Sequence, residues 1–201
     1  KIETPTVFSK VIEQDAKKIG YINIKIFSSV TTKQFKKQLS NLESQKIESL
    51  IIDVRDNNGG YLNVVTEITS LFLKKGQIIY QLSDSKGIEK IKDKTKEHRS
   101  YPIEVLVNKN SASASEILAS AIKETYGGTI IGTSTYGKGT VQKTKQLSNG
   151  TMIKYTIQKW LTPSGEWINE KGLKPNEEVK LETDADEQLQ KALKIAVSKI
   201  N

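Results

Sequence analysis

Three serines and one glycine-flanked lysine are the residues of this sequence best suited to covalent chemistry. Ser111, Ser113 and Ser115 alternate with alanines in the stretch SASAS, and small neighbours let a substrate backbone approach a serine hydroxyl. Lys138 stands in the stretch GKG, where glycines allow a tight turn around an ammonium group. The pattern suggests a serine nucleophile with a nearby base. It does not separate the three serines, because Ser113 or Ser115 could instead be the N-cap of a following helix.

The sequence offers few other bases or nucleophiles. It contains no cysteine, which excludes thiol nucleophiles and thiolate metal sites. Its one histidine, His98, lies in the charged stretch KDKTKEHRS, which is typical of a solvated loop. These observations disfavour a serine-histidine triad and favour serine-lysine chemistry.

Lys138 has the sequence surroundings that a lysine base requires. A lysine accepts a proton only when it is neutral, and burial among apolar side chains favours the neutral form. The stretch TIIGTSTYGKGTVQ is partly apolar and has no acidic residue. Gln142 lies four residues after Lys138, a spacing that puts both on one face of a strand or helix, so its amide could orient the lysine. Lys109 and Lys123 are interpreted as surface lysines.

Composition limits the classes of partner. The 201 residues carry a net charge of +8, which suggests contact with an anionic surface or an acidic partner. Nucleic acid is disfavoured as a partner, because Arg55 and Arg99 are the only arginines and no basic stretch is rich in aromatic residues. No run of apolar residues is long enough to cross a membrane. The absence of cysteine does not decide the compartment.

Hydrophobic patterns predict an α/β protein in which strands and helices alternate. Apolar or alternating runs predict strands at 19–27, 49–54, 103–107 and 129–131, and hairpins at 77–91 and 139–161, the second around an Asn-Gly turn. Apolar spacing of three or four predicts helices capped by Thr31 or Thr32, over 62–72, over 116–125, and at the C-terminus with Leu189, Leu193, Ala196 and Ile200 on one face.

Two glycines, Gly59 and Gly60, follow the predicted strand 49–54 and precede a predicted helix. Backbone N–H groups at such a place can bind an oxyanion. The alternative is a tight turn that needs a positive φ angle.

Four stretches together resemble the carboxyl-terminal processing peptidases, the tail-specific serine protease family: DVRDNNGGYL, VNKNSASASEI, GTSTYGKGTVQ and LTPSGEWINEKGLKPN. The resemblance implies that Ser113 is the nucleophile, that Lys138 is the general base and that Gln142 supports the lysine. It also implies an oxyanion hole made by the N–H groups of Gly59 and Ala114. The implied fold is a β-β-α core similar to the crotonase and Clp protease folds, with a flanking β-hairpin region.

The resemblance extends from about Ile19 to Pro175 and implies a serine endopeptidase that cuts extended or C-terminal segments of a polypeptide, without a cofactor or metal. We expect residues 1–201 to form a single protease core domain without the family's PDZ domain and N-terminal cap. The resemblance also implies a bacterial cell-envelope or secreted protein, with a membrane anchor as an option for a longer chain. The alternatives are a peptide- or ligand-binding module with the same fold but no catalysis, and an acyl-transferring enzyme of crotonase type.

Overall fold

A six-stranded sheet forms the centre of the computed structural model, which describes residues 4–182 and 185–200. Its strand order is β1-β2-β3-β6-β7-β10, with β1 (Val7–Gln14), β2 (Lys17–Ile24), β3 (Ser49–Asp53), β6 (Ile103–Val107), β7 (Thr129–Gly132) and β10 (Glu177–Glu178). Only the β1-β2 pair is antiparallel; the other neighbours are parallel. Every residue of β3 and β6 is buried, as expected for parallel strands covered on both faces.

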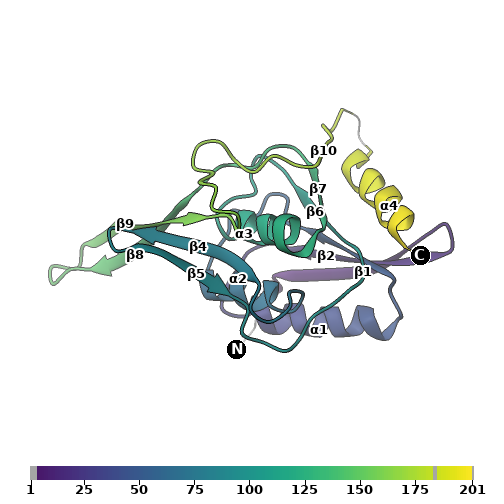
Figure 1. Cartoon of the computed structure of the whole chain (residues 1–201), viewed down its shortest axis with the longest axis horizontal. Helices are drawn as coiled ribbons and strands as arrows, with labels where there is room; N and C mark the ends of the chain where they lie inside the picture. Colours follow the sequence, from purple (N-terminus) through teal and green to yellow (C-terminus); the bar gives the residue numbers. More distant parts are fainter. Residues whose placement is uncertain (1–3, 183–184, 201) are drawn as a thin grey trace.

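Helices cover both faces of this sheet (Figure 1). The helices α1 (Thr31–Ser44), α2 (Leu62–Thr69) and α3 (Ala114–Ala121) pack on one face, and α3 continues into a π-helical turn, Ile122–Tyr126. The helix α4 (Glu187–Lys199) covers the other face. Successive residues of a strand point to opposite faces, so Leu50 and Ile52 join the α1-α2-α3 core whereas Ile51 packs toward α4.

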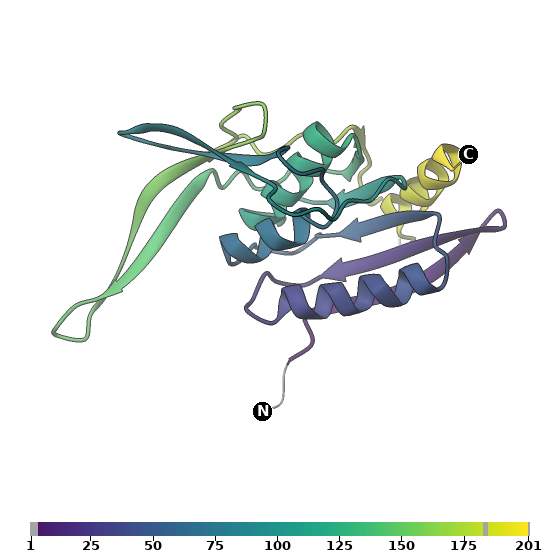
Figure 2. The same ribbon diagram turned by 60° about the horizontal axis from the view of Figure 1, so that its bottom comes forward.

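A second sheet has the order β5-β4-β9-β8, with β4 (Ile78–Asp84), β5 (Gly87–Lys92), β8 (Thr140–Gln146) and β9 (Met152–Leu161). The hairpin of β8 and β9, residues 140–161, is called the arm here, because it extends well beyond the body of the molecule (Figure 2). Most of the arm is exposed, whereas Trp160 and Leu161 at its base are buried. The arm therefore joins the core only at its base.

The structure confirms the predicted α/β class and the order of the elements that were predicted. Strands β1 and β10 were not predicted, and α2 ends at Thr69, before the end of the helix predicted over 62–72. The prediction for the third helix was wrong at its boundaries: α3 begins at Ala114, and the π-helical turn replaces its last part. The predicted cap of the first helix was also wrong, because Val30 is the N-cap of α1. Thr31 instead donates its hydroxyl to Ile26 O and accepts from Ser28 N, which stabilises the preceding loop.

The predicted buried face of the C-terminal helix was rotated. Gln188, Ala192 and Ala196 are the buried residues of α4, whereas Leu189 and Leu193 are only partly buried. The small alanines let α4 lie close to the sheet, and the leucines pack along its sides. Among the described residues, no helix has the length and apolar character needed to cross a membrane.

Candidate active site

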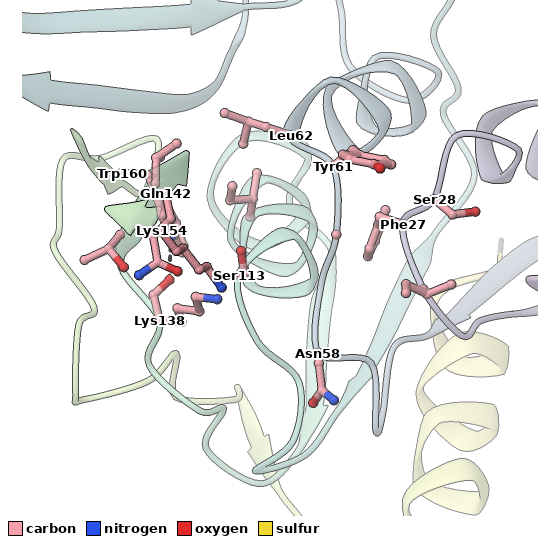
Figure 3. A pocket seen from close by; sticks show the side chains of 15 residues that line it. Phe27, Ser28, Asn58, Tyr61, Leu62, Ser113, Lys138, Gln142, Lys154 and Trp160 are labelled. Atoms are coloured by element: carbon pink, nitrogen blue, oxygen red, sulfur yellow. Dashed lines mark hydrogen bonds between the residues drawn. The ribbon is translucent and has the colours of Figure 1, made fainter. Parts of the chain in front are cut away.

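A cleft with a volume of about 510 Å³ lies between the arm, the start of α3 and the segments around Phe27 and Gly60. Figure 3 shows Lys138, Gln142, Lys154 and Trp160 on one side of it, Phe27 and Tyr61 on the other, and Ser113 between them. All three predicted catalytic side chains, those of Ser113, Lys138 and Gln142, line this cleft. Its lining contains no aspartate or glutamate.

The structure separates the three serines that the sequence could not. Ser111 and Ser115 are fully buried, and their hydroxyls donate to Val54 O and Asn57 O, each at 2.8 Å. Ser113 is half-buried and is the one of the three that lines the cleft. It is the N-cap of α3 and has a φ of 56°, a left-handed conformation that is rare for a residue with a side chain. Strained backbone of this kind is concentrated at functional sites.

Glu116, which the sequence analysis did not single out, joins the segments that carry Ser113 and Lys138. Its carboxylate is completely buried. Oε2 accepts from the N–H groups of Ser113 at 2.8 Å and Lys138 at 3.0 Å. Oε1 accepts from Gly137 N at 2.7 Å and Thr135 Oγ1 at 2.5 Å. Hydrogen bonds donated to a buried carboxylate are strong, so this set of contacts, called the Glu116 clamp, fixes the two segments relative to each other.

A signal for Glu116 was present in the sequence. A serine followed three residues later by glutamate is the pattern of a capping box, in which the glutamate side chain accepts from the N-cap N–H. Ser113 and Glu116 have this spacing and this contact. Nothing local indicates that the same carboxylate also binds residues 135–138.

The main chain of Lys138 is held on both sides. Its N–H belongs to the Glu116 clamp, and its carbonyl oxygen accepts from Trp160 Nε1 at 2.7 Å. A side chain at Gly137 would come within 2.7 Å of Gly172 N, and one at Gly139 within 2.6 Å of Trp167 Nε1. The two glycines around Lys138 are therefore required by close packing of residues 167–172 against this turn.

Gln142 is an exposed residue near the base of the arm, next to a register shift between Val141 and Gln142. The prediction placed Gln142 and Lys138 on one face of a regular strand, and the register shift interrupts that regular strand. Both side chains nevertheless line the cleft. Among the described residues, no hydrogen bond joins the Gln142 amide to the Lys138 ammonium group. The orienting role of Gln142 stays a prediction.

The predicted oxyanion donors lie next to Ser113. Gly59 has a φ of 100°, and a β-carbon there would come within 2.9 Å of Ser113 Cβ and 3.0 Å of Ala114 N. In the described part of the chain the Ala114 N–H has no partner, but the Gly59 N–H donates to Asn57 Oδ1 at 2.9 Å. The N–H of Gly60, which also lines the cleft, has no partner among these residues either. The paired role of Gly59 and Ala114 therefore stays a prediction.

An ion-pair network supports the loop that carries these glycines. Arg55 contacts Asp53 Oδ2 at 2.7 Å and Asp186 Oδ1 at 2.7 Å. Burial opposes the charge of Arg55, but its hydrogen bonds to Asp186 and Asp53 raise its pKa. Burial likewise acts against the Asp186 carboxylate, yet the Arg55 contacts lower the pKa of Asp186. The network ties the start of α4 to the end of β3, immediately before Asn57.

The remaining sequence candidates lie elsewhere. His98 and Lys109 are exposed and do not line the cleft. Lys123 donates to Lys174 O. Within the described ranges, no group of three or more histidine, cysteine, aspartate or glutamate residues could hold a metal ion.

Comparison with known proteins shows the family. The model of peptidase family S41 matches residues 18–179. The chain belongs to peptidase family S41. It is 43% identical over 181 residues to "Carboxy-terminal processing protease CtpB" of Bacillus subtilis, covering 90% of this chain and 38% of that protein. It is 38% identical to "Carboxy-terminal processing protease CtpA" of the same organism, covering 90% of this chain and 38% of that protein.

Solved structures of other proteins share the fold. The photosystem II D1 C-terminal processing protease superposes with a TM-score of 0.82 at 28% identity, covering 96% of this chain and 53% of that one. Mature CPAF, solved with lactacystin, has a TM-score of 0.79 at 17% identity and covers 97% of this chain and 55% of its own. The chain thus spans a little over a third of the two Bacillus relatives and about half of these solved chains.

Proposed function

We propose that this chain is the catalytic core of a serine endopeptidase that cuts extended polypeptides with a Ser113 nucleophile and a Lys138 base. One observation carries the proposal: Ser113 and Lys138 line the same cleft, and a single buried carboxylate binds the backbone N–H of both. Membership of family S41 supports the reaction class.

In the proposed acylation step, Ser113 Oγ attacks the carbonyl carbon of a substrate peptide while its proton passes to the neutral amine of Lys138. The N–H of Ala114, together with that of Gly59, stabilises the negative oxygen of the tetrahedral intermediate. The intermediate collapses by breaking the C–N bond, and the Lys138 ammonium group protonates the departing amine. A water molecule then gives a proton to Lys138 and attacks the ester. The C–O bond to Ser113 breaks, and Ser113 Oγ takes the proton back from the Lys138 ammonium group.

The cleft and its borders suit an extended substrate. Ile26 and Tyr61 are exposed apolar residues at the cleft, and Leu62 and Ile117 contribute further apolar surface. Strand β8 is an edge strand, so its outer backbone groups are free to pair with a polypeptide. The chemistry of the site therefore favours a polypeptide over a compact small molecule.

The test uses an unstructured polypeptide and a serine-reactive phosphonate probe. Ser113→Ala should abolish both turnover and labelling while the thermal unfolding curve changes little, because only one half-buried hydroxyl is lost. Lys138→Arg should be inactive although the charge is kept, because arginine is not deprotonated in proteins. Ser148→Ala, in the exposed turn of the arm, is the matched control. An active Lys138→Arg enzyme would refute the lysine base.

A binding module without catalysis is the second candidate. The observation in its favour is the hydrogen bond from Gly59 N to Asn57 Oδ1, which occupies one of the two proposed oxyanion donors. In that case folded wild-type protein would bind peptides, release no products, and keep its affinity in Ser113→Ala.

We also propose that the core acts within a longer bacterial protein outside the cytoplasm, in which a PDZ domain presents the substrate. The bacterial origin of the Bacillus relatives and the share of their length that the chain spans support this proposal. Cell fractionation and sequencing of the full reading frame test it.

A further inference from the structure

Lys154 is a cation in the cleft that the proposed reaction does not use. Of the residues that line the cleft, only Lys138 and Lys154 are basic, and none is acidic. Lys138 has the proposed role of the base, whereas Lys154 lies near the start of β9, toward the free end of the arm. Figure 3 shows its side chain on the arm side of the cleft, beside Gln142 and Lys138 and facing Ser113.

Strand register explains why Lys154 faces the cleft. In the arm, Gln142 is opposite Thr156 and Thr144 is opposite Lys154. Residues two apart on a strand share a face, so Lys154 lies on the same face as Gln142, which lines the cleft. Lys143 and Lys145 alternate with these residues and project from the opposite face.

No group of the described chain neutralises Lys154. Other lysines have partners: Lys17 with Glu48 and Lys191 with Glu177 as ion pairs, and Lys159 with the ring of Trp167 at 4.0 Å. Lys154 has no hydrogen-bond, ion-pair or ring partner among the residues that the structure describes. Residues 125–165 contain five lysines and no aspartate or glutamate, so the arm itself supplies no anion.

We propose that Lys154 is a specificity-determining residue that binds a carboxylate of the substrate close to the scissile bond. The proposal rests on the proposed peptidase function. Lys154 lines the cleft and no aspartate or glutamate does, so a bound carboxylate would gain attraction that a neutral group would not. The carboxylate comes either from an aspartate or glutamate side chain or from the free C-terminus of the polypeptide, and the experiment separates the two sources.

Binding and cleavage are measured separately. One peptide set replaces a single glutamine by glutamate at successive positions around the cleavage site, and a second compares a free C-terminus with its amide. Dissociation constants are measured by fluorescence anisotropy in the Ser113→Ala protein, and kcat/KM is measured in the protein that retains Ser113. Lys154→Gln and Lys154→Glu are compared with Lys145→Gln and Lys145→Glu, which make the same charge changes on the opposite face of the arm.

We expect the wild-type protein to prefer one carboxylate-bearing peptide by roughly 1.5- to fivefold, the range for a solvent-accessible charge pair. Lys154→Gln should bring this ratio close to one and Lys154→Glu should invert it, whereas both Lys145 variants should keep it. The preference should weaken at high salt. A preference for the glutamate peptides assigns a side-chain carboxylate, and a preference for the free terminus assigns the terminal one.

The inference is overturned if the Lys154 and Lys145 variants show the same ratio of affinities for the carboxylate-bearing and neutral peptides. It is also overturned if no peptide pair differs in affinity when Lys154 is present. Those outcomes leave the peptidase function intact wherever cleavage is seen. A carboxylate preference in the Ser113→Ala background that Lys154→Glu inverts, without any cleavage by the parent protein, would instead support the binding site and refute the proposed function.

Discussion

The central sheet and the arm contribute to the same cleft but differ in almost every physical respect. Strands β3 and β6 are buried along their whole length, whereas most residues of β8 and β9 are exposed. Ser113 follows a buried strand and begins a buried helix, and Lys138 immediately precedes the arm. The core thus fixes the proposed nucleophile, and the Glu116 clamp brings the proposed base to it from a region with little core of its own.

The largest effect on stability should appear when an isoleucine is replaced by alanine in each of the two regions. Ile52→Ala in β3 removes a side chain that is fully buried, and we expect it to lower the free energy of unfolding by about 2–5 kcal/mol. Ile153→Ala in β9 removes a side chain that is 42% exposed, and we expect a change within about 0.5 kcal/mol. Urea denaturation measures both values. Equal losses would show that the arm packs against something in solution.

Glu116→Gln tests the joint between the two regions. The amide keeps the shape but turns one acceptor into a donor that faces buried N–H groups, which should cost about 2–4 kcal/mol of stability. A displacement of Ser113 relative to Lys138 should lower kcat by at least about a hundredfold. Glu67→Gln, an exposed glutamate on α2, is the control and should change neither quantity. Wild-type kcat in Glu116→Gln would contradict the clamp.

Gly59→Ala tests how closely the glycine loop approaches the serine. The new methyl group would come within 2.7 Å of Ala112 O, so we expect kcat to fall about ten- to a hundredfold as Ser113 shifts. Gly76→Ala is the control: its φ is 88° and its β-carbon meets nothing within 4 Å, so it bears a similar backbone penalty without the clash. Comparable kcat values in the two variants would show that Gly59 has no special role.

Glu104 in β6 predicts a smaller, pH-dependent effect. Burial raises the pKa of this carboxyl, although Lys199 and Ser49 act in the opposite direction. Above the ordinary pKa of a glutamate, the folded state still holds a proton that the unfolded state has lost. The contribution of Glu104 to stability therefore falls as the pH rises above that ordinary pKa. Glu104→Gln should remove that fall, which denaturation curves between pH 4 and 8 would reveal. An unchanged pH profile would show that Lys199 keeps the carboxyl ionised.

The sequence predicted what short-range patterns control. Alternation and buried apolar runs predicted most of the strands. Apolar spacing of three or four predicted the helices, and in α1 the residues with this spacing, Phe35, Leu39 and Leu42, are buried. The resemblance placed Ser113, Lys138 and Gln142 in one site, and the structure brings their side chains to one cleft.

Long-range contacts account for what the sequence did not predict. Burial and hydrogen bonds to Val54 and Asn57, residues distant in the sequence, distinguish the hydroxyls of Ser111 and Ser115 from that of Ser113. The reach of Glu116 to Thr135 depends on how the turn before the arm docks. The sequence does not show which face of the arm carries Lys154. The strand register, which places Lys154 opposite Thr144, is needed to assign it to the face of Gln142.

The Glu116 clamp also has a consequence for biosynthesis. A nascent peptidase is surrounded by its own unfolded chain, an ideal substrate. Ser113 and Lys138 take their relative positions only when residues 135–138 dock on the start of α3 through the Glu116 contacts. Under the proposed mechanism neither half is competent before that contact forms, which would limit self-digestion of the folding polypeptide.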